Sequence, residues 1–239
     1  MRLSIIVPAY NEEKRIGSTL KSIDEYLRRQ NYDYEILVVN DGSKDNTADL
    51  VNGLRSEIVG LRLIDNKENH GKGYVVRQGM LEAKGEFRLF TDADNSTSID
   101  HLDKFIPYLS QGYSAIIGSI GISGHKVASG SEPAWRRILG KLGNLFIQIM
   151  AVPGIQDTQR GFKLFTADAV GKIFPKLTIT KWGFDIEVLA LARKFGYKIK
   201  EVPVDWKNDP NSKVGLKAYL QVLLETVRIR WNLMTGRYN

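Results

Sequence analysis

The sequence of 239 residues contains no cysteine and only three histidines, His70, His101 and His125. The absence of cysteine excludes disulfide bonds, thiolate catalysis and cysteine-based zinc sites. Three histidines that lie far apart in the sequence do not suggest a histidine metal cluster either. If the protein binds a metal ion, we therefore expect carboxylates to be its ligands.

Long hydrophobic runs are also missing. The apolar run at residues 5–7 ends at Pro8 and is too short to be the hydrophobic core of a signal peptide. No stretch approaches the roughly 18 to 20 apolar residues that a membrane-spanning helix needs. We therefore expect a cytoplasmic protein. Its length and its 43% of hydrophobic residues fit one large globular domain, or one domain with a small extension.

Acidic residues are fewer than basic ones: 27 Asp and Glu stand against 34 Lys and Arg, which gives a formal net charge of +7. Such a balance favours an anionic partner, which could be a nucleotide, a nucleic acid or an acidic lipid. The basic residues form no arginine-rich run and accompany no RNA-type aromatic signature, so we do not expect a nucleic-acid partner. A surface charge that only keeps the protein soluble is equally compatible with these counts.

Short apolar strands alternate with amphipathic helices in the first half of the chain. Strands are predicted at 3–7, 34–40, 61–64 and 87–91, and helices at 14–29, 43–56 and 72–84. This alternation with short connections predicts an α/β fold, a mainly parallel sheet flanked by helices on both faces. Ligands of such sheets bind at the carboxyl ends of the strands. The polar loops there are 8–12, 40–43, 66–72 and 92–96.

The second half has fewer predicted strands, at 113–119, 162–165 and 199–206. Helices are predicted at 135–152, 167–174, 184–195 and 216–234. The last helix is amphipathic, with a broad apolar stripe beside Lys217, Arg228 and Arg230. We expect it to form a C-terminal extension at 214–239, after a domain at 1–213 that divides into halves at 1–100 and 101–213.

Asp92-Ala93-Asp94 follows the predicted strand 87–91. Two carboxylates with this spacing at a strand exit can converge on one hard cation such as Mg²⁺ or Mn²⁺, which in turn can hold a diphosphate. The same pair is also typical of a turn or of the cap of a following helix. On the residues of this segment alone, the turn is the commoner case.

Two further loops allow a structural and a functional interpretation. Asp41-Gly42 can cap the next helix, or Asp41 can accept hydrogen bonds from the imide of a nucleobase. The loop 69–73, Asn-His-Gly-Lys-Gly, can be an ordinary turn and cap, or its glycines and lysine can approach an anion at a helix start.

Four segments, at 7–12, 38–45, 69–73 and 92–94, together closely resemble the nucleotide-sugar half of family 2 glycosyltransferases, which have the GT-A fold. The resemblance implies that a divalent metal ion binds Asp94 with help from Asp92. It also implies a nucleotide-sugar site formed by Pro8, Ala9, Tyr10, Asn11, Glu12, Asp41, Gly42, Asn69, Gly71, Lys72, Gly73, Asp92 and Ala93.

The second half narrows the resemblance. The segments 157–165, 182–187, 202–206 and 211–213 look like those of polyprenyl-phosphate glycosyltransferases, nearer to the dolichyl-phosphate β-glucosyltransferase branch than to the mannosyl branch. One departure is Ser96, which stands where the mannosyl enzymes usually have a glutamine. Ser96 suggests that water or a substrate phosphate takes the place of a third side-chain metal ligand.

The reaction implied by this resemblance moves a hexose from a nucleotide diphosphate to a lipid monophosphate with inversion. Asp94, Asp157 and Arg160 are its candidate catalytic residues, and Trp182, Asp185, Ser212 and Lys213 its candidate acceptor site. A phosphate acceptor is already ionised near pH 7, since its second pKa is about 6. Asp157, the family's usual candidate base, is therefore expected to orient the acceptor or a nearby cation. Asp185 and Glu187 on the predicted helix 184–195 could contact sugar hydroxyls or Lys213, but as isolated residues such carboxylates are more often solvated or ion-paired.

UDP-glucose is the expected donor, with GDP-mannose as the alternative. Other readings are a family 2 transferase with a saccharide acceptor, and a nucleotide-sugar-binding regulator without turnover. The lipid acceptor implies peripheral association with the cytoplasmic face of a membrane. The apolar segments 138–152 and 216–234 could make that contact, although core packing or contacts in an oligomer explain them equally well.

Overall fold

The computed structural model of the chain describes residues 2–124, 134–207 and 216–239, with the backbone alone at 134–139 and 216. The expected acceptor residues Ser212 and Lys213 lie outside these ranges. The expected boundary between a domain at 1–213 and an extension at 214–239 lies outside them too, and it stays a prediction.

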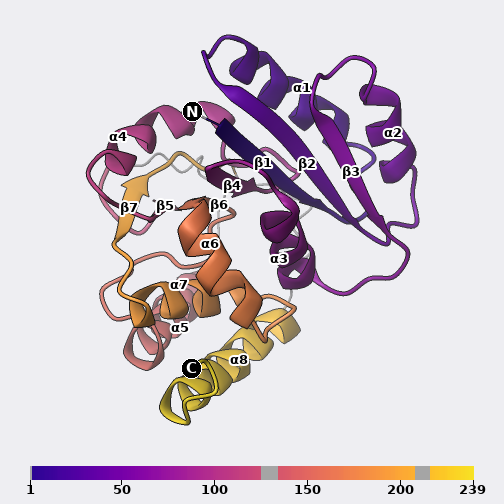
Figure 1. Ribbon diagram of the computed structural model, residues 1–239. Helices are drawn as coiled ribbons and strands as arrows, with labels where there is room; N and C mark the ends of the chain where they lie inside the picture. Colours follow the sequence, from indigo (N-terminus) through magenta and orange to yellow (C-terminus); the bar gives the residue numbers. More distant parts are fainter. Residues whose placement is uncertain (1, 125–133, 208–215) are drawn as a thin grey trace.

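Within the described ranges, seven strands form one sheet in the order β3-β2-β1-β4-β6-β5-β7 (Figure 1). The strands are β1 (Arg2–Ala9), β2 (Asp33–Asp41), β3 (Leu61–Asn66), β4 (Phe87–Thr91), β5 (Ala115–Ser119), β6 (Phe162–Thr166) and β7 (Ile199–Pro203). Strand β6 runs antiparallel to β4 and β5, whereas the other neighbouring pairs are parallel. The predicted mainly parallel sheet is thus confirmed.

Helices cover both faces of the sheet, as predicted. They are α1 (Ile16–Arg28), α2 (Thr47–Leu54), α3 (Lys72–Glu82), α4 (Ile106–Leu109), α5 (Ala134–Met150), α6 (Ala167–Ile173), α7 (Phe184–Lys194) and α8 (Leu216–Met234), with 3-10 turns η1 (Ile99–Lys104) and η2 (Phe174–Lys176). The short elements η1, α4 and η2 were not predicted. Helix α2 begins at Thr47 rather than residue 43, because Lys44 N–H donates to Asn11 and the Asp45 carboxylate accepts from Thr47.

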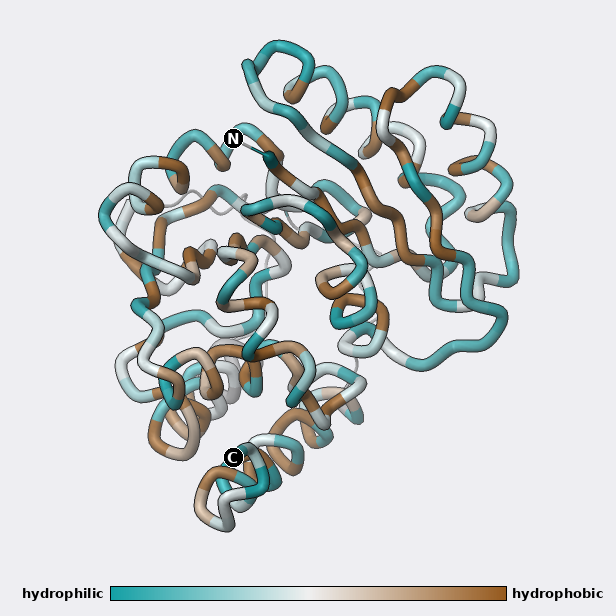
Figure 2. Tube along the Cα trace, in the orientation of Figure 1, coloured by the Kyte–Doolittle hydropathy of each residue, from teal (hydrophilic) through white to brown (hydrophobic). Residues whose placement is uncertain are grey.

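The side chains of the central strands alternate between two hydrophobic cores, as the pleat of a β-strand requires. Leu3, Ile5 and Val7 of β1 pack with α1, α2 and η1, whereas Ile6 faces the core shared by α3, α6, α7, α5 and α8. Figure 2 shows the resulting hydrophobic segments along β1 and β2. None of the helices in the described ranges has both the length and the hydropathy of a membrane-spanning helix.

A buried carboxylate ties the C-terminus to the segment between η2 and α7. Glu187 of α7 is fully buried. It accepts hydrogen bonds from the backbone N–H groups of Thr178 at 3.0 Å and Ile179 at 2.8 Å, and from the phenol of Tyr238 at 2.5 Å. Burial and the bond to Glu187 raise the pKa of Tyr238 to about 12. We call this arrangement the Glu187 clasp, and its contacts explain why Glu187 is structural rather than a ligand of sugar hydroxyls.

The clasp predicts a large effect of one hydroxyl. Tyr238→Phe should lower the free energy of unfolding by about 1.5 to 3 kcal/mol, because a buried carboxylate loses a charge-assisted hydrogen bond. Tyr197→Phe is the matched control: its hydroxyl donates to Asp168 at 2.6 Å on the exposed surface, and its loss should cost less than about 1 kcal/mol. Urea unfolding of both variants measures the difference. Equal losses in the free energy of unfolding would show that the clasp stabilises the fold no more than an exposed hydrogen bond does.

Candidate functional site

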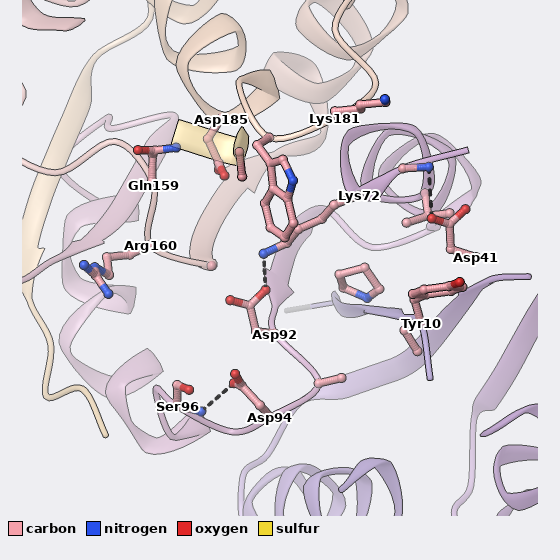
Figure 3. A pocket seen from close by; sticks show the side chains of 18 of the residues that line it. Tyr10, Asp41, Lys72, Asp92, Asp94, Ser96, Gln159, Arg160, Lys181 and Asp185 are labelled. Atoms are coloured by element: carbon pink, nitrogen blue, oxygen red, sulfur yellow. Dashed lines mark hydrogen bonds and ion pairs between the residues drawn. The ribbon is translucent and has the colours of Figure 1, made fainter. Parts of the chain in front are cut away.

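A cavity of about 750 Å³ opens at the carboxyl ends of the parallel strands (Figure 3). This volume is typical of small-molecule sites. All four polar loops that the sequence places at this sheet edge contribute to its lining. The predicted residues from the first half that line it are Pro8, Ala9, Tyr10, Glu12, Asp41, Asn69, Gly71, Lys72, Asp92, Ala93 and Asp94.

The second half of the chain supplies the opposite wall. Arg160, Trp182 and Asp185 were predicted there and line the cavity. Asn11, Gly42, Gly73 and Asp157 were also predicted but are not among the lining residues. Several residues without a predicted binding role also line it: Arg15, Val75, Thr97, Gln159, Gly161, Lys181, Trp206, Ala218, Tyr219, Gln221 and Val222.

Asp41 ends β2 and shapes the loop after β3. Its two carboxylate oxygens accept the backbone N–H groups of His70 at 2.7 Å and Gly71 at 3.0 Å. Burial raises the pKa of Asp41 above its ordinary value, although these two hydrogen bonds act to lower it. The carboxylate therefore holds the neighbouring loop in place at the cavity wall, and it does not cap α2. Gly71 has a φ of 98°, which favours glycine at this position.

Lys72, the first residue of α3, reaches across the cavity to the loop after β4. Its Nζ lies 2.5 Å from Oδ1 of Asp92 (Figure 3). Burial lowers the pKa of Lys72, but the carboxylates of Asp92, Asp185 and Asp94 outweigh that effect and raise it above its ordinary value. The ammonium group therefore stays charged at neutral pH. Gly161 packs so tightly on this pair that a Cβ there would lie 2.0 Å from an Asp92 oxygen.

Asp94 has the geometry of a turn and also lines the cavity. Its Oδ1 accepts the backbone N–H of Ser96 at 2.9 Å, which is the turn that the sequence allowed. Within the described ranges no group of three His, Asp or Glu residues could hold a metal ion by itself. Two neighbouring carboxylates do fit a Mg²⁺ or Mn²⁺ that takes its remaining ligands from water and substrate phosphates. Asp94 and Asp92 are the residues that would hold it.

Asp185 at the start of α7 forms a buried ion pair beneath the cavity. Its Oδ1 lies 2.5 Å from Nζ of Lys163 on β6, and the Lys163 side chain is completely buried. Burial raises the pKa of Asp185, while Lys163 and Lys72 act in the opposite direction. The ion-pair alternative for Asp185 is thus the one observed. A lysine in the middle of the apolar strand 162–165 was the signal for this partner.

Asp157 points at its own neighbours instead of the cavity. Its Oδ2 accepts from Nε of Arg160 at 2.9 Å and from the backbone N–H of Ile120 at 3.1 Å. The Arg160 guanidinium in turn stacks on Trp206, with its central carbon 4.7 Å from the ring centroid. Glu201 of β7 accepts the backbone N–H of Asp157 at 3.0 Å. Asp157 therefore fixes the position of a cation that does line the cavity.

Two sequence comparisons relate the chain to known proteins. A model of the family described as "Glycosyl transferase family 2" matches residues 4–174. The dolichyl-phosphate beta-glucosyltransferase of Dictyostelium discoideum is 36% identical over 246 residues, which cover 98% of this chain and 75% of the relative. The human protein of the same name is 33% identical over 250 residues, covering 99% of this chain and 77% of the relative.

A comparison of structures gives the same fold. Glucosyl-3-phosphoglycerate synthase from Mycobacterium tuberculosis, solved in complex with UDP, superposes with a TM-score of 0.67 at 18% identity, covering 96% of this chain and 80% of that chain. At this identity the likeness shows the fold alone, which is the GT-A fold expected from the sequence.

Proposed function

The chain belongs to glycosyl transferase family 2, and we propose that it moves glucose from UDP-glucose to a polyprenyl or dolichyl monophosphate. The observation that carries the proposal is the cavity at the sheet edge, where carboxylates and basic side chains from both halves of the chain meet. The names of the relatives, which match nearly the whole chain at 33 to 36% identity, support glucose as the sugar and dolichyl phosphate as the acceptor.

In the proposed reaction, an oxygen of the lipid phosphate attacks the anomeric carbon of the hexose. The bond between that carbon and the diphosphate oxygen breaks, and its electron pair leaves with the nucleoside diphosphate. Attack from the face opposite the leaving group inverts the anomeric configuration. The acceptor phosphate is ionised at neutral pH, so the step needs no protein base.

The chain's basic side chains would stabilise the charge that develops on the leaving diphosphate. Lys72 stands at the start of α3, where backbone N–H groups also favour an anion. Arg160 reaches the cavity from the other wall, held by Asp157 and Trp206. A divalent metal ion on Asp94 and Asp92 would add electrostatic stabilisation of the same kind. Asp41 would accept a hydrogen bond from the nucleobase.

On the acceptor side, we propose that Trp182 and Asp185 lie near the bound lipid phosphate. Trp182 lines the cavity beside Lys181, in the segment anchored by the Glu187 clasp. Asp185 contributes through its ion pair with Lys163, which sets the shape of the cavity floor. A lipid acceptor also implies that the protein associates with the cytoplasmic face of a membrane.

Transfer to lipid is the direct test. The full chain is incubated with radiolabelled UDP-glucose or GDP-mannose, Mg²⁺ or Mn²⁺ and a polyprenyl phosphate, and the lipid phase is extracted. We expect label in lipid from UDP-glucose, its loss with EDTA and in Asp94→Ala, and a β-linked product from the α-linked donor. Label from GDP-mannose alone would favour the mannosyl alternative. Donor binding without release of diphosphate would favour the regulator. Absence of label in the lipid phase from both donors would refute the acceptor assignment.

Asp157 gives a second test, because an orienting group and a general base respond differently to substitution. Asp157→Asn keeps an oxygen that can accept from Arg160, so we expect less than about a tenfold loss of kcat, whereas loss of a base costs about 10²- to 10⁴-fold. Asp157→Ala leaves Arg160 without this partner and should lose more.

The pH profile supplies an independent readout for the same variants. If the lipid phosphate attacks unaided, the acid limb of the rate profile should remain near its second pKa of about 6 in Asp157→Asn. A dead Asp157→Asn enzyme that still binds both substrates would instead show that Asp157 removes a proton.

A further inference from the structure

The face of α8 that points away from the core is apolar and uncovered. Leu220, Leu224, Val227, Trp231 and Met234 are between 46% and 72% exposed. Their alternating spacing of four and three residues puts them on one side of the helix. Val222 and Ile229, on the opposite side, are buried in the core with α7. We call the five exposed residues the α8 stripe.

The neighbouring helix α5 continues this surface. It packs against α8, where Gly143 lies so close to the hydroxyl of Tyr219 that a Cβ would clash with it. Leu142, Leu145 and Ile149 of α5 are between 53% and 67% exposed, again at spacings of three and four residues. Of the twelve large apolar side chains that are exposed in the described parts of the chain, eight lie on these two helices. Such a concentration marks an interaction surface.

The charges beside the stripe have one sign. Lys217, Arg228 and Arg230 are exposed and flank the α8 stripe on both sides, and Figure 2 shows hydrophobic and hydrophilic residues alternating along the helix. The sequences of α5 and α8 contain six basic residues and one acidic residue, Glu225. The Glu225 carboxylate accepts the backbone N–H of Gly183 at 2.7 Å. An apolar face with basic flanks is complementary to an anionic bilayer.

The same charges argue against a second copy of the chain as the occupant. Helices that pair through such a stripe place the residues on its flanks opposite each other, and pairing is favoured when those flanks carry opposite charges. Arg228 and Arg230 lie on opposite flanks of the stripe, so two paired copies of α8 would bring like charges together.

We propose that the α8 stripe, with Leu142, Leu145 and Ile149 of α5, is the face by which the protein docks on an anionic lipid bilayer beside its active-site cavity. Tyr219 and Gln221 line the cavity, whereas Leu220 between them belongs to the stripe. A lipid phosphate in the bilayer therefore meets the cavity at the first turns of α8. This route for the acceptor rests on the proposed function; the docking itself does not.

Vesicle co-sedimentation of the full chain tests the docking. Leu224→Gln/Trp231→Gln should weaken binding to vesicles of phosphatidylcholine and phosphatidylglycerol by about tenfold or more, because buried apolar area drives interfacial binding. The control Leu50→Gln/Val59→Gln, which alters side chains that are 42% and 77% exposed elsewhere, should bind like the original protein. Arg228→Gln/Arg230→Gln should reduce the preference for phosphatidylglycerol over pure phosphatidylcholine.

Unchanged vesicle binding of Leu224→Gln/Trp231→Gln would overturn the proposal. A second contradicting result would come from sedimentation velocity. If the original protein is a dimer, and the two substitutions make it a monomer while vesicle binding persists, the stripe is a contact between copies.

Activity separates this inference from the proposed function. Leu224→Gln/Trp231→Gln should lose transfer to polyprenyl phosphate in vesicles but keep transfer to a short-chain, water-soluble prenyl phosphate. If the original protein glucosylates neither acceptor while the stripe variant alone loses vesicle binding, the docking face stands and the proposed function fails. Equal activity of variant and original protein on the vesicle acceptor would remove the stripe from the acceptor route.

Discussion

The parallel pairing of β1 with β2 and β4, and of β2 with β3, is the constraint on which the site depends. The register aligns Ala9 with Asn40, Asn40 with Asp65, and Ile6 with Phe90. The loops after these four strands therefore begin at nearly the same level of the sheet. Tyr10, Asp41, Lys72 and Asp94, which are far apart in the sequence, reach one cavity for this reason. A shift of one residue in this register would turn the side chains of a whole strand to the opposite face.

Ion pairs organise the charges that this topology brings together. Lys72 pairs with Asp92, Lys163 with Asp185, and Arg160 with Asp157. The Lys163–Asp185 pair is buried, and breaking such a pair by removing one member costs about 3 to 5 kcal/mol. An incoming diphosphate would compete with Asp92 for Lys72, and a metal ion would replace Lys72 as the partner of Asp92. The cavity thus contains charges whose positions are set by the protein itself.

Local patterns were sufficient to predict the strands and long helices, since the strands are short apolar runs and the helices repeat apolar residues every three to four positions. The convergence of the loops after β1 to β4 followed from the rule for parallel sheets. The antiparallel direction of β6 could not be predicted in this way, because the apolar pattern of residues 162–165 fits a parallel and an antiparallel strand equally well. Its partner choice depends on packing against β4 and β5, which are distant in sequence.

Contacts between distant side chains set the rest of the site. Glu187 and Tyr238 are 51 residues apart, and no periodicity links them. Trp206 lines the cavity where Arg160 stacks on it, and Tyr219 lines it where α8 packs against α5. Asp157 shows the converse case: its motif indicated function, but its carboxylate faces Arg160 and Ile120 rather than the cavity.

If the proposed function is right, this sheet edge binds a nucleoside diphosphate with the help of a metal ion on Asp94. Calorimetric titration of the full chain with UDP, in Mn²⁺ and in EDTA, measures this most directly. We expect UDP to bind more tightly in Mn²⁺ than in EDTA, and Asp94→Ala to abolish the difference. Absence of UDP binding under both conditions, or binding of equal strength in Mn²⁺ and EDTA, would contradict it.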